Sequence, residues 1–139
     1  MDPAGLPPGD GWLPAPVPGT VALARAAAGR DGTGDLHAED HWYRLDQPLP
    51  AGAELEFEGL ATVAEVWLDG VLAARSDSMF LPLRLLLPQG AARLELCFRA
   101  LRPLLGARRR PAARWHGRLA DSEGLRLHRT TLLGHMPGW

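Results

Sequence analysis

Apolar and polar residues alternate over two neighbouring stretches near the middle of the chain, residues 54–59 and 63–68. In the first stretch leucine and phenylalanine alternate with glutamate, and in the second Ala64, Val66 and Leu68 alternate with bulkier or charged residues. A period of two is typical of β-strands that bury one face and expose the other to water. The pattern therefore predicts two strands here, each with one buried and one wet face.

Asp69 and Gly70 follow the second of these stretches directly. Both residue types adopt positive φ more readily than most, which the tight two-residue turns of β-hairpins require. We therefore expect the chain to reverse here and to continue as a paired antiparallel strand.

The same alternation, with turn signals between the apolar runs, predicts seven strands in all. They span residues 41–49, 53–60, 63–69, 71–74, 79–87, 91–100 and 124–133. One helix is predicted over residues 20–29, with Thr20 as its N-cap and Gly29 past its end. Residues 1–18 should form an irregular lead-in, residues 30–39 a loop and residues 102–113 a surface excursion. Short strands at this spacing predict an all-β sandwich.

Strand alternation also predicts which side chains form the core. The inward-pointing set consists of Leu55, Phe57, Val66, Leu68, Leu83, Leu85, Leu94, Leu96 and Phe98. Cys97 should lie on the opposite face of its strand, together with the charged residues Arg93, Glu95 and Arg99. We expect it to be an inert thiol, because no neighbouring histidine would activate it.

Composition narrows the classes of partner. The formal net charge of the 139 residues is −1, so no strong field would recruit nucleic acid or an anionic membrane. The apolar runs are far shorter than the roughly 20 residues that span a bilayer. No signal peptide is visible at the start, and the single cysteine permits no internal disulfide, so we expect a cytoplasmic protein.

No self-contained catalytic, metal or cofactor site is evident. His37 and His41 lack a second pair of ligands, so no metal site is predicted. Asp77 and Glu123 do not form a credible catalytic pair, and Asp77 is expected to fix the turn at residues 76–78 instead. The arginine triplet at residues 108–110 is expected to be a solvated loop.

Four segments carry a resemblance to a known family. Residues 57–82, FEGLATVAEVWLDGVLAARSDSMFLP, are similar to the FxGL–xxAEVWLNG–xxxSDNMFxP block in the N-terminal domain of β-mannosidase-like enzymes of glycoside hydrolase family two. Residues 17–21, VPGTV, resemble the entry to that domain, and residues 40–44, DHWYR, resemble its (D/E)WWYR strand. Arg114, Trp115 and residues 125–139 resemble its closing segment. In this order the matches cover nearly the whole chain.

The resemblance implies a jelly roll of the galactose-binding-domain type, spanning residues 1–139 as a single domain. In this family the two catalytic carboxylates belong to a (β/α)₈ barrel, a fold that takes about 250 residues. Such a barrel does not fit here. We therefore expect the first domain of a longer glycosidase, which by itself hydrolyses no glycoside.

The resemblance also implies where the domain meets substrate and barrel. By position, Asp40, His41, Trp42 and Arg44 are candidates for the rim of the substrate pocket. A tryptophan beside a carboxylate and an arginine would also suit a sugar ring and its hydroxyl groups. Candidates for packing against the barrel are Trp115, Leu132, Leu133 and Trp139. The family's Asp-Trp-Gly does not follow Trp139, so we expect the sequence to stop within the closing segment.

Two other functions stay open at this point. The chain could be an autonomous carbohydrate-binding module, which would bind sugar by itself. It could instead be a purely structural interaction domain, which would bind only its partner domain.

Overall fold

The computed structural model describes residues 5–30 and 34–105. These residues belong to two compact units, the first containing residues 5–12 and 40–99 and the second residues 13–30, 34–39 and 100–105. The predicted strand at 124–133, the arginine triplet, Glu123 and the barrel-packing candidates Trp115, Leu132, Leu133 and Trp139 lie outside the described residues. No helix within the described residues is both long and apolar enough to cross a membrane.

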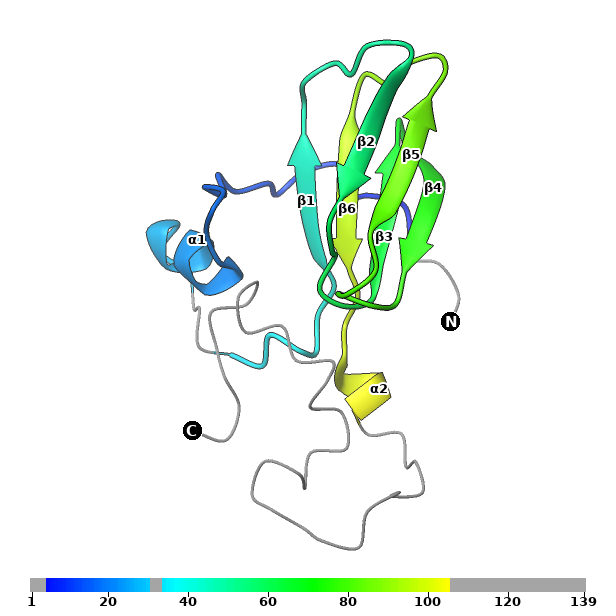
Figure 1. Cartoon of the computed structure of the whole chain (residues 1–139). Coiled ribbons are helices and arrows are strands. Elements are labelled where there is room, and N and C mark those ends of the chain that lie inside the picture. Colours follow the sequence, from blue (N-terminus) through cyan, green and yellow to red (C-terminus); the bar gives the residue numbers. More distant parts are fainter. Residues whose placement is uncertain (1–4, 31–33, 106–139) are drawn as a thin grey trace, which may run out of the picture. The chain divides into compact units, whose positions relative to one another are not determined.

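The first unit is built from antiparallel strands (Figure 1). They are β1 His41–Leu45, β2 Ala53–Phe57, β3 Ala64–Leu68, β4 Val71–Ser76, β5 Leu83–Leu87 and β6 Leu94–Phe98. One sheet has the strand order β1-β6-β3-β4, and the other pairs β2 with β5. Each strand lies at a predicted position, which confirms the all-β fold class. Most are shorter than predicted, because the alternation of apolar and polar residues runs on into the turns.

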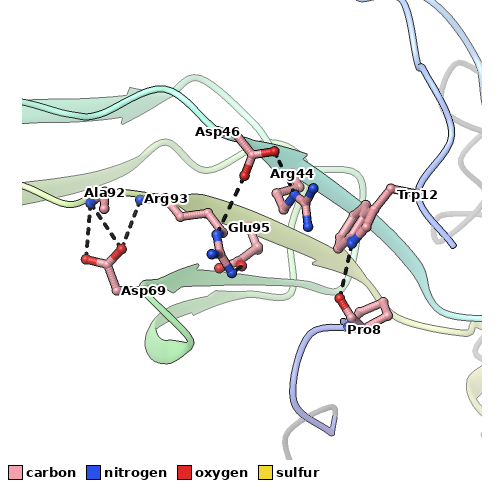
Figure 2. A network of polar contacts seen from close by, with 8 residues as sticks. All are labelled: Pro8, Trp12, Arg44, Asp46, Asp69, Ala92, Arg93 and Glu95. Atoms are coloured by element: carbon pink, nitrogen blue, oxygen red, sulfur yellow. Dashed lines mark hydrogen bonds and ion pairs between the residues drawn. The ribbon is translucent and has the colours of Figure 1, made fainter. Parts of the chain in front are cut away.

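The turn between β3 and β4 confirms the hairpin prediction. Asp69 and Gly70 have φ values of 50° and 79°, and Leu68 pairs directly with Val71. The carboxylate of Asp69 also accepts hydrogen bonds from the backbone N–H of Ala92, at 3.0 Å, and of Arg93, at 2.9 Å (Figure 2). The turn residue therefore fixes the hairpin to the chain that enters β6.

Two connections join the sheets at one place. The backbone N–H of Leu49, between β1 and β2, donates to the carbonyl of Ala91, between β5 and β6, at 2.7 Å. The backbone N–H of Ala91 donates back to the Leu49 carbonyl at 3.0 Å. Because two of the four connections between the sheets are bound to each other here, the β2–β5 pair is held against the larger sheet (Figure 1).

The inner face of the four-stranded sheet carries the core of this unit. Val66, Leu94 and Phe98 are buried there as predicted, with Ala64 beside them. The remaining predicted core residues, Leu55, Phe57, Leu68, Leu83, Leu85 and Leu96, are half-buried. Four of these six lie on the sheet of two strands, which covers too little area to enclose them fully.

The opposite face of β3 and β6 departs from the prediction. Glu65 and Glu95 are only 3% and 1% exposed, and Trp67 and Cys97 are buried with them. The expected wet face is therefore wrong for these two central strands. It is right for β2, where Glu54 and Glu56 are exposed. We call the opposite face of the four-stranded sheet, defined by the side chains of Trp42, Arg44, Glu65, Trp67, Leu72, Arg75, Glu95, Cys97 and Arg99, the outer face.

The second unit contains the predicted helix, α1 Val21–Ala27. The Thr20 hydroxyl accepts a hydrogen bond from the backbone N–H of Leu23 at 3.2 Å, and Gly29 follows the helix with a φ of 68°. Both capping predictions are thus confirmed. A short helix, α2 Arg102–Leu105, occupies the start of the stretch predicted as a surface excursion. No helix was predicted there, although Pro103 lies in a first helical turn, which accepts proline.

A close backbone contact in the first unit yields a stability prediction. A Cβ added at Gly59 would lie 2.2 Å from the carbonyl oxygen of Met79. We expect Gly59→Ala to lower the free energy of unfolding by about 1–3 kcal/mol, the usual cost of overpacking. Gly9→Ala is the control, because nothing lies within 4 Å of the added carbon. Equal urea midpoints for the two variants would contradict this backbone contact.

Tyr43 gives a prediction for alkaline pH. Its ring meets Phe98 edge-on, with centroids 5.7 Å apart, and burial raises the pKa of its phenol above the ordinary value. Because the folded pKa is the higher one, stability is complete below the unfolded pKa of about 10 and falls as pH rises through the folded pKa. Tyr43 is the only tyrosine, so tyrosinate absorbance reports this group alone. The titration should lie at higher pH in the folded chain than in urea, and Tyr43→Phe should reduce the alkaline loss of stability.

Candidate functional site

The register of the four-stranded sheet gathers charged and aromatic side chains on its outer face. Trp42 of β1 pairs with Cys97 of β6, which pairs in turn with Glu65 of β3. One row further along, Arg44 pairs with Glu95, which pairs with Trp67. Because alternate residues of a strand share a face, these rows lie side by side on one surface.

An apolar cluster lies within this charged surface. Trp67 and Cys97 are its buried members, and Trp42 and Leu72 pack against them. The rings of Trp42 and Trp67 are 5.8 Å apart between centroids and tilted by 56°. Leu72 and Ala74 are two residues apart and would share a face in a regular strand. A β-bulge in β4 instead places Leu72 opposite Trp67 on the outer face, while Ala74 pairs with Val66 on the inner face.

Glu65 is the most connected carboxylate of the outer face. Its Oε1 accepts a hydrogen bond from Arg99 Nη1 at 3.0 Å and lies 3.5 Å from Arg75 Nε. Its Oε2 accepts a hydrogen bond from the indole Nε1 of Trp67 at 3.2 Å. Both oxygens are therefore engaged, which offsets the cost of burying the charge.

Arg99 links Glu65 to a second carboxylate. Its Nε lies 3.2 Å from Asp40 Oδ2, and its side chain is 16% exposed. Burial by itself would lower the pKa of the Arg99 guanidinium, but Asp40 and Glu65 outweigh it and hold that pKa above its ordinary value. Arg99 is thus a permanently charged bridge between a buried carboxylate and one near the surface.

A second set of contacts surrounds Arg44 (Figure 2). Its Nε donates to Asp46 Oδ2 at 2.9 Å, and its guanidinium carbon lies 4.5 Å from the centroid of the Trp12 ring. The Trp12 indole donates in turn to the carbonyl of Pro8 at 3.1 Å. Through Trp12 the lead-in, which has no helix or strand in its described part, is fixed against β1.

Glu95 is buried with fewer contacts. Its Oε1 lies 3.4 Å from Arg93 Nη1, while Arg93 Nε lies 3.6 Å from Asp46 Oδ1. Its Oε2 has no hydrogen-bond partner among the described residues. Figure 2 shows Arg93 between the two carboxylates.

The predicted rim residues divide between the two faces of β1. Trp42 and Arg44 lie on the outer face, and Asp40 joins them through its ion pair with Arg99. His41 is buried on the inner face, opposite Phe98, so the structure does not bring it together with the other three.

The sequence did not predict the residues that support Asp40, Trp42 and Arg44. Glu65 and Arg99 were expected on wet faces, and Trp67 was not linked to Trp42. A usable signal was present, because Trp67 and Cys97 are apolar residues at positions that alternation assigned to water. Because this face is buried, Glu65 and Glu95, which share it with Trp67 and Cys97, form ion pairs with arginines.

The turn at residues 76–80 is held by serine side chains. The Ser76 hydroxyl donates to the Ser78 carbonyl, and the Ser78 hydroxyl accepts from the Phe80 N–H. The expectation that Asp77 fixes this turn is therefore wrong. Among the residues that the structure describes, no three His, Cys, Asp or Glu side chains are grouped in a way that could hold a metal ion.

The chemistry available along β1 suits polyhydroxylated molecules. β1 is an edge strand of its sheet, and the side chains of Asp40 and Arg44 are 30% and 25% exposed. A carboxylate accepts hydrogen bonds from hydroxyl groups, a guanidinium donates them, and an indole face packs on apolar C–H groups.

One protein-family model matches most of the chain. The family model described as glycosyl hydrolase 2 galactose-binding domain-like matches residues 5–124. Among solved structures the chain is similar to the GH2 β-galacturonidase from Eisenbergiella tayi bound to galacturonate, with a TM-score of 0.47 and 19% sequence identity. That similarity covers 66% of this chain and 16% of the other. No curated protein matches the chain.

Proposed function

Because the chain belongs to the galactose-binding-like domain family of glycosyl hydrolase 2, we propose that it is a non-catalytic domain of a β-mannosidase-like glycoside hydrolase. In this proposal it packs on the catalytic barrel and shapes the rim of the glycoside pocket. The barrel supplies the catalytic carboxylates.

The observation that supports the rim role is the grouping of Asp40, Trp42 and Arg44 along one edge strand. All three are partly exposed, and each is held by a contact from another part of the unit. Pre-positioned polar and aromatic groups bind a sugar at a lower entropic cost than mobile ones.

The preference for a β-mannoside rests on the sequence motifs. Residues 40–44 and 57–82 are the segments that resemble β-mannosidase-like enzymes most clearly. His41, which departs from the aromatic of the family pattern, is buried on the inner face. We therefore assign the rim role to Asp40, Trp42 and Arg44 and leave His41 out of it.

The proposal is tested first on the isolated chain. We expect no hydrolysis of aryl β-mannosides, β-galactosides or β-glucosides above a buffer control, because the barrel is the catalytic part. We also expect no calorimetric binding of the free monosaccharides, together with measurable association with a separately produced family two barrel. Sugar binding by the chain alone would instead indicate an autonomous carbohydrate-binding module. Barrel association without any effect of rim substitutions on glycoside kinetics would indicate a purely structural domain.

A further inference from the structure

Glu65 lies at the branch point of the outer-face contacts. It is 3% exposed and in the middle of the sheet, on β3 between β6 and β4. Its Oε1 accepts a hydrogen bond from Arg99 and its Oε2 accepts one from Trp67, and each of these side chains contacts a rim residue in turn.

The first branch runs through Arg99 to Asp40. Glu65 Oε1 is 3.0 Å from Arg99 Nη1, and Arg99 Nε is 3.2 Å from Asp40 Oδ2. A guanidinium can serve two carboxylates at once because its donors are fixed in one plane. Glu65 thus restricts the orientation of the guanidinium that faces Asp40.

The second branch runs through Trp67 to Trp42. Glu65 Oε2 accepts the indole hydrogen bond of Trp67 at 3.2 Å, which sets the ring's direction on the sheet. The Trp42 ring packs against that indole with centroids 5.8 Å apart. Glu65 therefore restricts the surface on which Trp42 rests.

We propose that Glu65 is a positioning residue for the rim, holding Asp40 through Arg99 and Trp42 through Trp67. This inference rests on the proposed rim function of Asp40 and Trp42. It adds that one buried carboxylate sets the orientation of both, although it would not touch the sugar itself.

Glu95 provides a matched control. It is also a buried glutamate on the outer face, at 1% exposure, and its side chain forms an ion pair with Arg93. Glu95→Gln removes an equally buried charge, and the ion pair that it weakens belongs to neither branch. Any effect of Glu65→Gln that Glu95→Gln does not share therefore reflects the branches.

The experiment uses the full chain and two readouts. The first is the far-ultraviolet exciton circular dichroism of the Trp42–Trp67 pair, assigned by its loss in Trp42→Phe. We expect Glu65→Gln to weaken this signal and Glu95→Gln to preserve it. The second is a double-mutant cycle of Glu65→Gln with Asp40→Asn, in which the stability of each variant is measured by urea unfolding. We expect the shifts of the midpoint to be non-additive, because the two residues share Arg99.

Branch-specific variants keep the test valid if Glu65→Gln does not fold. Arg99→Lys should abolish the coupling between positions 65 and 40 while preserving the exciton signal, since an ammonium is a compact point charge without the planar fork of donors that lets a guanidinium bind two carboxylates. Trp67→Phe should abolish the exciton signal while preserving the coupling between positions 65 and 40. An unchanged exciton signal together with additive midpoints would overturn the proposal. The rim function would be tested separately, by the effects of Asp40 and Trp42 substitutions on glycoside kinetics.

Discussion

Phe98→Ala should lower the free energy of unfolding by about 3–5 kcal/mol, the range found for deleting a buried phenylalanine ring. Phe98 is 7% exposed and lies on the inner face of β6, between His41 and Ala64. The substitution removes its burial and its edge contact with Tyr43. Because small domains have about 5–15 kcal/mol of stability in total, the loss should be evident in urea unfolding.

Phe80→Ala is the matched control for this substitution. Phe80 is 81% exposed, in the loop between β4 and β5, and exposed substitutions usually change stability by less than about 0.5 kcal/mol. If Phe98→Ala shifted the midpoint no more than Phe80→Ala, the assignment of β6 residues to the inner face would be wrong.

Arg99→Leu should lower the free energy of unfolding by a similar amount, because it breaks a buried ion pair. It removes the ion-pair partner that lies 3.0 Å from Glu65, which is 3% exposed, and it also removes an ion-pair partner of Asp40. Breaking a buried ion pair by removing one partner costs about 3–5 kcal/mol. Urea unfolding at neutral pH measures this loss.

Arg84→Leu is the control for charge removal in an exposed pair. Arg84 and Glu56 form an ion pair across β2 and β5 with side chains 64% and 47% exposed, so we expect a change of about 0–1 kcal/mol. Replacing both Glu65 and Arg99 by leucine should recover part of the Arg99→Leu loss, because no buried charge is then left unpaired. Equal effects of Arg99→Leu and Arg84→Leu would show that the outer face is solvated.

The sequence predicted strand positions better than it predicted burial. β2 exposes its glutamates as alternation predicts, because the outer side of the two-stranded sheet faces water. β3 and β6 have similar alternation, yet their glutamates are buried by neighbours on adjacent strands. Burial of this kind depends on which strands become central, and a local pattern does not carry that information.

The candidate site was predictable in part. The motif at residues 40–44 drew attention to Asp40, Trp42 and Arg44, and alternation along β1 explains why His41 lies apart from them. The supporting contacts join residues far apart in sequence, such as Glu65 with Arg99 and Asp69 with Ala92. They depend on strand register, which tertiary packing determines and a single sequence leaves open. The short helix α2 spans four residues, too few for a helical period to be recognised.

The central proposal is that this domain shapes the rim of a glycoside pocket. The most direct test is steady-state kinetics of a glycosidase that carries this chain as its first domain, with Trp42→Ala compared with Leu86→Ala, a change at a 68% exposed position on β5. We predict that Trp42→Ala raises KM for an aryl β-mannoside while kcat changes much less, because a rim contact contributes binding rather than chemistry. Leu86→Ala should leave both constants unchanged. Identical KM values for the two variants and the unaltered enzyme, with both variants folded, would contradict the rim function.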